Sequence, residues 1–107
     1  MNDLLFTILT PLGFTVRTNR GYWQKIVSKH PDIEDRIDKI KNTLRDPIEV
    51  RESSRDEDIL LFYGAKEKYW MVVVARRLNG EGFIITAYRT DAIKEGRCVY
   101  GSGQGIL

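Results

Sequence analysis

The chain has 107 residues, of which 42% are apolar and 30% are charged. This length suits one domain with one hydrophobic core, and the composition excludes an intrinsically disordered chain. A net charge of only +2 excludes a strongly basic protein that binds polyanions with its whole surface. Arginine outnumbers lysine by ten to seven, which favours forked contacts with phosphate groups.

The single cysteine, Cys98, cannot form an intramolecular disulfide, which favours a cytosolic setting. One cysteine and one histidine also argue against a structural zinc site, and no cofactor is expected. The apolar run at residues 4–9 is too short to span a membrane. It follows Asn2 and Asp3 rather than the basic segment of a secretory signal. We therefore expect a soluble cytoplasmic protein with no membrane contact.

Two consecutive helices are predicted, near residues 19–29 and 32–45. Apolar residues recur at helical spacing in both, and Thr18 or Asn19 can cap the first helix. The first helix is predicted to end at the dipeptide His30-Pro31, because proline disfavours helical geometry in the residue before it. The only histidine of the chain therefore lies at a helix junction.

Residues after Pro47 alternate with a period of two, which indicates strands. Four strands are predicted there, at residues 48–52, 59–63, 69–76 and 83–90, and a hairpin of residues 4–9 and 14–18 precedes the helices. The predicted fold is α+β, with the two helices packed on one face of an antiparallel β-meander. Residues 1–100 form this single domain, with one helical turn at 91–94, and residues 101–107 form a flexible tail.

Alternation in the last predicted strand assigns its side chains to two faces of the sheet. The core face receives Phe83, Ile85 and Ala87, and the open face receives Ile84, Thr86 and Tyr88. In the first strand after Pro47, the core face receives Ile48 and Val50, and the open face receives Glu49 and Arg51. The phase thus predicts an open-face patch that contains Arg51, Thr86 and Tyr88.

Several short motifs follow one another in an order that resembles a known nuclease family. They are Trp23 followed by His30-Pro31, the strand start Pro47–Val50, the aromatic Leu61–Tyr63, the hydrophobic Met71–Val74 and the closing Ile85–Tyr88. This order resembles the phage-type branch of the barnase–EndoU–colicin–RelE (BECR) family, which has a RelE-like nuclease fold. The resemblance covers roughly residues 13–97, and its weight comes from the order of the motifs.

The resemblance implies a metal-independent endoribonuclease, either a toxin or an effector derived from a phage or mobile element. Such enzymes attack the phosphodiester with the adjacent 2′-hydroxyl and leave a cyclic phosphate. The reaction needs an acid or base that titrates near neutral pH, a cation beside the phosphorane, and positioning hydroxyls. The catalytic residues that fit these needs are His30 as acid or base, Arg51 as cation, and Thr86 and Tyr88 as hydroxyls.

The resemblance also implies residues that bind the substrate. Trp23 or Tyr22 is expected to stack on an unpaired base, and Arg89 is a second candidate cation. Lys25 is also expected to bind the substrate. It occupies a helix position where the resemblance implies a second histidine, so the acid–base pair is incomplete there. The expected partner is RNA, an antitoxin or immunity protein is an open alternative, and the chain is expected to be a monomer or a homodimer.

Plainer interpretations stay open for the same residues. His30 before a proline can be a helix cap alone, and Trp23 shares a helical stripe with core residues. The chain can instead be an inactive RNA- or protein-binding module on the same fold, or a structural protein that dimerises through its edge strands. Catalysis predicts that His30 lies near Arg51, Thr86 or Tyr88. A binding module predicts a basic groove with His30 pointing elsewhere, and a structural protein predicts a second copy on the open sheet face.

Overall fold

The structure is a computed structural model that describes residues 3–93 and 96–101. In chain order its elements are β1 (Leu4–Leu9), β2 (Thr15–Asn19), α1 (Arg20–Lys29), the 3₁₀ turn η1 (Pro31–Ile33), α2 (Ile37–Arg45), β3 (Glu49–Glu52), β4 (Ile59–Tyr63), β5 (Trp70–Leu78), β6 (Glu81–Thr90) and β7 (Arg97–Gly101). The α+β class, the first helix and the strands predicted after Pro47 are confirmed. The second helix is present but begins at Ile37 rather than at residue 32, because residues 31–33 form the 3₁₀ turn η1.

The strands form one seven-stranded sheet in the order β1-β2-β6-β5-β4-β3-β7. Strands β3 to β6 are a continuous antiparallel meander, and β1 and β2 are the expected hairpin. The hairpin joins the meander through a parallel pairing of β2 with β6, which the sequence did not predict. The sheet is therefore mixed and mostly antiparallel.

The end of the chain differs from its prediction. β7 pairs with β3, so Gly101 ends a strand and does not begin a tail. The rest of the predicted tail, residues 102–107, lies outside the described residues. Residues 91–93 are not helical, and residue 94 of the predicted helical turn also lies outside them.

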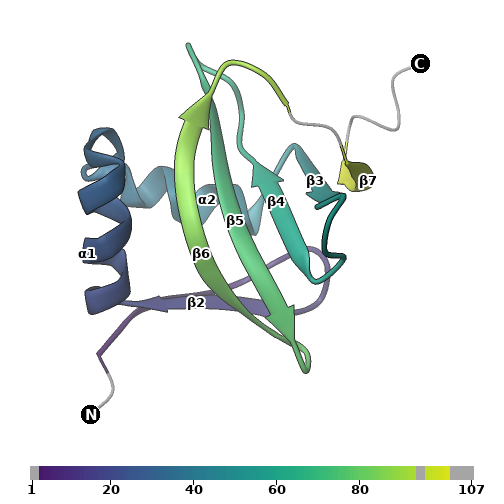
Figure 1. Cartoon of the computed structure of the whole chain (residues 1–107), viewed down its shortest axis with the longest axis horizontal. Coiled ribbons are helices and arrows are strands. Elements are labelled where there is room, and N and C mark those ends of the chain that lie inside the picture. The colour runs from purple at the N-terminus through teal and green to yellow at the C-terminus, as the bar shows by residue number, and fades with distance from the viewer. Residues whose placement is uncertain (1–2, 94–95, 102–107) are drawn as a thin grey trace.

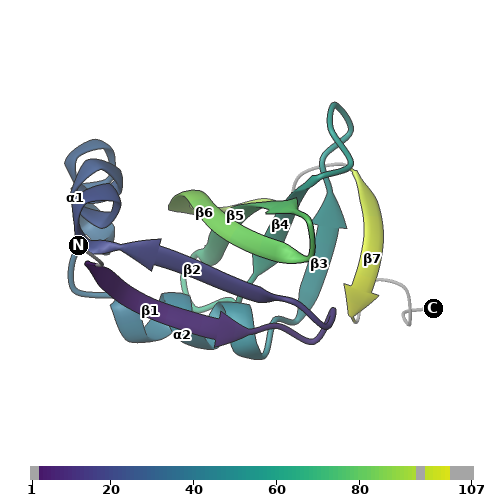
Figure 2. The ribbon, with the colours of Figure 1, turned by 90° about the horizontal axis from the view of Figure 1, so that it is seen from below.

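The two helices contribute to one core in different positions. α2 lies against β1, β4 and β5 and buries Ile40 and Leu44, as its predicted stripe requires. α1 stands at the β2–β6 side of the sheet and buries Trp23, Ile26 and Val27 (Figure 1 and Figure 2). β2 pairs only with the first residues of β6, so the second half of β6 has no strand on the side where α1 stands.

A β-bulge in β6 corrects the predicted phase of that strand. Thr86 lies opposite Val74 and Ile84 lies opposite Ala75, so Ile85 is an extra residue without a partner in β5. A one-residue insertion reverses the alternation on one side of it. Ile84 is therefore buried in the core, whereas Phe83 is exposed and Ile85 is half-buried, contrary to the prediction.

The sheet face that was predicted to be open carries a second apolar cluster. It consists of Leu61, Tyr63 and Val72, with Ile48, Trp70, Val74, Tyr88 and Ile93 packed around them. Ile48 was predicted to face the main core and instead belongs to this cluster. This second cluster therefore covers part of that sheet face, and α1 lies beside the face only along β6.

Two local features fix the start of β6. Asn79 and Gly80 both have positive φ, of 54° and 81°, which is the backbone of a tight turn between β5 and β6. Gly82 allows β2 to approach closely, because a Cβ there would lie 2.8 Å from the Phe14 ring and 2.9 Å from Val16. No helix among the described residues is both long and apolar enough to cross a membrane.

Candidate functional site

The candidate site begins with the two ends of α1. The Asn19 side chain accepts a hydrogen bond of 2.7 Å from the Tyr22 backbone N–H and caps the helix. At the other end His30 leaves helical geometry, with φ −134° and ψ 72°, and Pro31 starts η1. The break predicted at His30-Pro31 is confirmed, and it places the imidazole at the end of α1.

A pocket of about 560 Å³ lies between α1 and β6. We call it the α1–β6 pocket, and it is lined by Tyr22, Lys25, Ile26, Ser28, Lys29, His30, Ile85 and Thr86. Its volume is within the range of small-molecule sites, and its wall combines apolar groups with basic and hydroxyl groups. The fold therefore brings three of the predicted site residues, His30, Thr86 and Lys25, to one pocket.

The β6 bulge helps to form the floor of this pocket. The Tyr22 hydroxyl donates a hydrogen bond of 2.6 Å to the carbonyl of Ile85, the residue left without a β5 partner. β2 pairs with β6 only as far as Phe83, so at Ile85 the strand faces α1 rather than another strand. This hydrogen bond fixes the position of the Tyr22 ring beside the pocket.

Tyr88 lies next to His30. The two ring centroids are 5.9 Å apart and the rings are tilted by 34°. Burial raises the pKa of Tyr88 above 10.0, and neighbouring Tyr63 raises it further. The phenol beside His30 is therefore protonated at neutral pH and can donate a hydrogen bond.

The pocket carries two positive charges without acidic partners. Lys25 and Lys29 lie one helical turn apart and are exposed. No carboxylate of the described residues lies within ion-pair distance of either ammonium group. Ion pairs do hold Arg17, Arg20, Lys39, Arg51, Arg76, Arg89 and Arg97. The pocket wall is thus suited to an anion.

Arg89 is near this site but is already engaged. Its Nε donates a hydrogen bond of 2.8 Å to the Asp32 carboxylate, and its guanidinium lies 5.2 Å from the centre of the Tyr69 ring. The hydrogen bond from Arg89 lowers the pKa of Asp32 below 3.8, and the nearby His30 contributes to the same direction. The pair joins η1 to β6, close to the contact between His30 and Tyr88.

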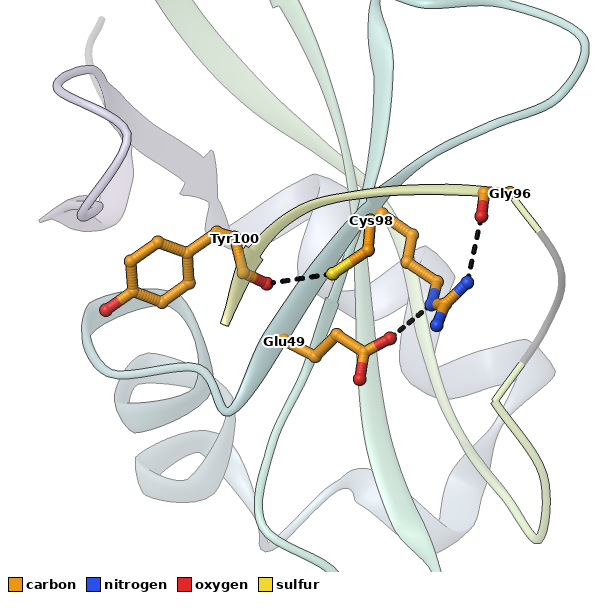
Figure 3. Close-up of polar contacts among 5 residues, drawn as sticks. Glu49, Gly96, Cys98 and Tyr100 are labelled. Atoms are coloured by element: carbon orange, nitrogen blue, oxygen red, sulfur yellow. Dashed lines mark hydrogen bonds and ion pairs between the residues drawn. The ribbon is translucent and has the colours of Figure 1, made fainter. Parts of the chain in front are cut away.

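The structure does not bring Arg51 to the pocket. Arg51 shares a sheet face with Thr86, but β4 and β5 lie between their strands. Three strand spacings separate them, about 14 Å. Its guanidinium is bound to the buried carboxylate of Glu49 and donates a hydrogen bond of 2.8 Å to the Gly96 carbonyl. Figure 3 shows these contacts where β3 and β7 run side by side, next to Cys98 and Tyr100.

Trp23 does not reach the pocket either. Its side chain is in the main core and only 7% exposed, so the interpretation as a core residue is correct and a base cannot stack on it. The prediction of Trp23 as a substrate contact is wrong, because the pocket lies on the neighbouring stripe of α1, which carries Tyr22.

Four lining residues were not predicted as part of the site: Ile26, Ser28, Lys29 and Ile85. Lys29 follows Lys25 by four positions and adjoins His30, so helical spacing alone was a sufficient signal for it. Ile85 had no such signal, because its position depends on the bulge. In the described part of the chain, histidine, cysteine and carboxylate side chains form no cluster of three or more that is suited to a metal ion.

Comparisons of the chain with protein-family models, with curated proteins and with solved structures give no significant match.

Proposed function

We propose that this chain is a metal-independent endoribonuclease whose centre is the α1–β6 pocket. The observation that carries the proposal is the joint presence of an imidazole, a hydroxyl and two ammonium groups without acidic partners in one pocket. They belong to His30, Thr86, Lys25 and Lys29. These are the group types that cleavage of RNA by its own 2′-hydroxyl needs.

In the proposed reaction the 2′-oxygen forms a bond to the adjacent phosphorus, and the bond from phosphorus to the 5′-oxygen breaks. His30 in its neutral form takes the proton of the 2′-hydroxyl. The leaving 5′-oxygen needs a proton from a second group, for which we propose the ammonium group of Lys25 or Lys29 in the same pocket. The products are a 2′,3′-cyclic phosphate and a 5′-hydroxyl.

The remaining groups have supporting roles in this proposal. The ammonium charges of Lys25 and Lys29 stabilise the charge that develops on the phosphorane, a role first predicted for Arg51. The Thr86 hydroxyl and the protonated Tyr88 hydroxyl orient the phosphate and the imidazole. Arg89 acts indirectly, because its contact with Asp32 holds η1 against β6.

An inactive RNA-binding module on the same fold is the second candidate. The observation that favours it is the single imidazole, because the resemblance implies a second histidine where Lys25 stands. An ammonium group is a weaker acid than imidazolium, so the proton transfer to the 5′-oxygen is the most demanding step. Such a module would retain the basic pocket and lose turnover.

The test is an assay of the purified chain on a mixed-sequence RNA pool, with and without EDTA, followed by analysis of the product ends. We expect cleavage that survives EDTA and leaves cyclic phosphates. His30→Ala is expected to lower the rate by about 10²–10⁴-fold, the usual contribution of a general acid or base. Thermal melts of both proteins check that the variant is folded.

Each contrary result has a defined meaning. Cleavage that disappears in EDTA, or a His30→Ala protein with an unchanged rate, would falsify the mechanism. If no RNA is cleaved but the wild type retards RNA in a gel, the binding module replaces the nuclease. If RNA is neither cleaved nor bound, both candidates fail.

A further inference from the structure

We infer that Tyr63 is a positioning residue of the candidate site, and that its hydroxyl holds the Tyr88 phenol against His30. Tyr63 does not line the α1–β6 pocket, so it acts through Tyr88 and not on a ligand. The inference rests on the proposed function only for its effect on cleavage. The position of the His30 ring can be measured without RNA.

The Tyr63 side chain lies deep in the second apolar cluster. It is 0% exposed, and the other buried members of the cluster are Leu61 and Val72. Phenylalanine would fill the same space without a polar atom. A phenol hydroxyl in apolar surroundings costs free energy unless polar groups lie near it. The hydroxyl therefore points to a role of Tyr63 beyond packing.

The register of the sheet places Tyr63 and Tyr88 on opposite sides of Val72. Tyr63 faces Val72 in the pairing of β4 with β5, and Tyr88 faces Val72 in the pairing of β5 with β6 (Figure 1). All three side chains belong to the second apolar cluster and thus share one face of the sheet. Two strand spacings, about 10 Å, separate the backbones of the two tyrosines. Val72 is fully buried between their side chains.

Tyr88 connects this cluster to the imidazole. On one side its ring centroid lies 5.9 Å from that of His30. On the other side it packs against the cluster that contains Tyr63. Burial raises the pKa of Tyr88 and the Tyr63 phenol raises it further, so the two phenols lie within electrostatic reach of each other. Tyr88 therefore stands between a fully buried phenol and the proposed acid or base.

The carboxylates near this row of side chains are bound to arginines. Glu49 faces Tyr63 from β3, and its carboxylate is bound to Arg51. Asp32, which interacts with His30, accepts a hydrogen bond of 2.8 Å from Arg89. Both charges are thus compensated. The neutral Tyr63 hydroxyl is the polar group that the register places beside Tyr88 on the sheet.

The experiment uses the imidazole itself as the reporter. His30 is the only histidine, so in the untagged chain its ring-proton resonances are identified without further assignment. Spectra are recorded at about pH 9, well above the ordinary pKa of histidine, so that the ring has the same charge in all samples. Tyr63→Phe keeps the ring and removes the hydroxyl. We expect it to displace the His30 resonances in the same direction as Tyr88→Phe.

The double variant tests whether the two hydroxyls act together. If Tyr63 acts through Tyr88, Tyr63→Phe should cause no further displacement in a Tyr88→Phe background. Leu61→Val is the matched control, because it alters packing in the same cluster and removes no hydroxyl. Its His30 resonances should equal those of the wild type. Thermal melts check that each variant is folded.

Cleavage assays add a second readout under the proposed function. Tyr63→Phe should lower kcat by about twofold to tenfold, the effect of losing one polar contact between neutral groups, and leave KM unchanged. Unchanged His30 resonances in Tyr63→Phe, additive displacements in the double variant, or an equal displacement by Leu61→Val would each overturn the inference. A wild type that cleaves no RNA defeats the nuclease proposal alone, since the resonances still decide the role of Tyr63.

Discussion

The two sides of the sheet use their cations in opposite ways. At the β3–β7 side, Arg51 is bound to Glu49 and to the Gly96 carbonyl, and Arg97 is bound to Glu52. At the α1–β6 side, Lys25 and Lys29 line a pocket and have no carboxylate partner among the described residues. The cations at the β3–β7 side are thus already compensated, whereas those in the pocket are available to an anion. Arg51 is the better phosphate ligand by type, yet its charge is already compensated.

The largest expected effect tests whether Arg51 is structural. Arg51→Met removes the partner of Glu49, whose side chain is only 5% exposed. An uncompensated buried carboxylate is costly, so the free energy of unfolding should fall by about 3 kcal/mol. The value is at the lower end of such effects, because Arg51 itself is 24% exposed. Urea denaturation followed by circular dichroism measures the change.

A neighbouring ion pair on the same two strands provides the control for Arg51. Arg97→Met breaks the contact with Glu52, but Arg97 is 74% exposed, so the loss should stay below about 1 kcal/mol. The double variant Glu49→Gln/Arg51→Met should recover part of the stability. A stable Arg51→Met protein that has lost RNA cleavage would contradict the structural role and return Arg51 to the site.

The second prediction concerns the lysines without acidic partners. Under the proposed function, Lys25→Ala and Lys29→Ala should each remove one backbone contact. The slope of log affinity against log salt for single-stranded RNA should then fall by about 0.7 for each variant. The affinity itself should fall several-fold at moderate salt. Filter binding at a series of salt concentrations measures both values.

Lys66→Ala is the control for these lysines. Lys66 is an exposed lysine in the connection between β4 and β5, and it does not line the pocket. Its loss should leave the salt slope unchanged. If Lys66→Ala lowers the slope as much as Lys25→Ala does, the anion is bound by the general surface charge and not by the pocket.

The elements that the sequence predicted correctly depend on local patterns. The stripe that buries Ile40 and Leu44 follows from helical spacing. The end of α1 follows from Pro31, because the restriction that proline imposes acts on the adjacent residue. For the same reason, the position of His30 at a helix junction follows from the sequence alone.

The features that the sequence did not reveal depend on contacts between distant segments. The parallel pairing of β2 with β6 has no local signature, since hydrogen bonds between strands involve backbone groups that nearly every residue has. The bulge at Ile85 reverses the alternation of side chains in β6, and the sequence pattern of the strand does not indicate it. The engagement of Arg51 with Gly96 required β7, whose last residue was predicted to begin a tail.

The smallest expected effect concerns the ion pair on the α1–β6 side, between Asp32 and Arg89. The pKa of Asp32 is lowered in the folded chain, chiefly by the hydrogen bond from Arg89. An acid whose folded pKa is lowered contributes stability above its unfolded pKa of 3.8, and this contribution is lost as the pH falls through the folded value. Because both side chains are partly exposed, the contribution should be less than about 1 kcal/mol.

Asp32→Asn should thus melt slightly below the wild type at pH 7, and the two melting curves should converge below pH 3.8. Asp35→Asn, which alters an exposed carboxylate two residues after the 3₁₀ turn, should melt like the wild type at pH 7. A gap between Asp32→Asn and the wild type that persists unchanged at low pH would mean that the substitution acts through packing and not through the charge of Asp32.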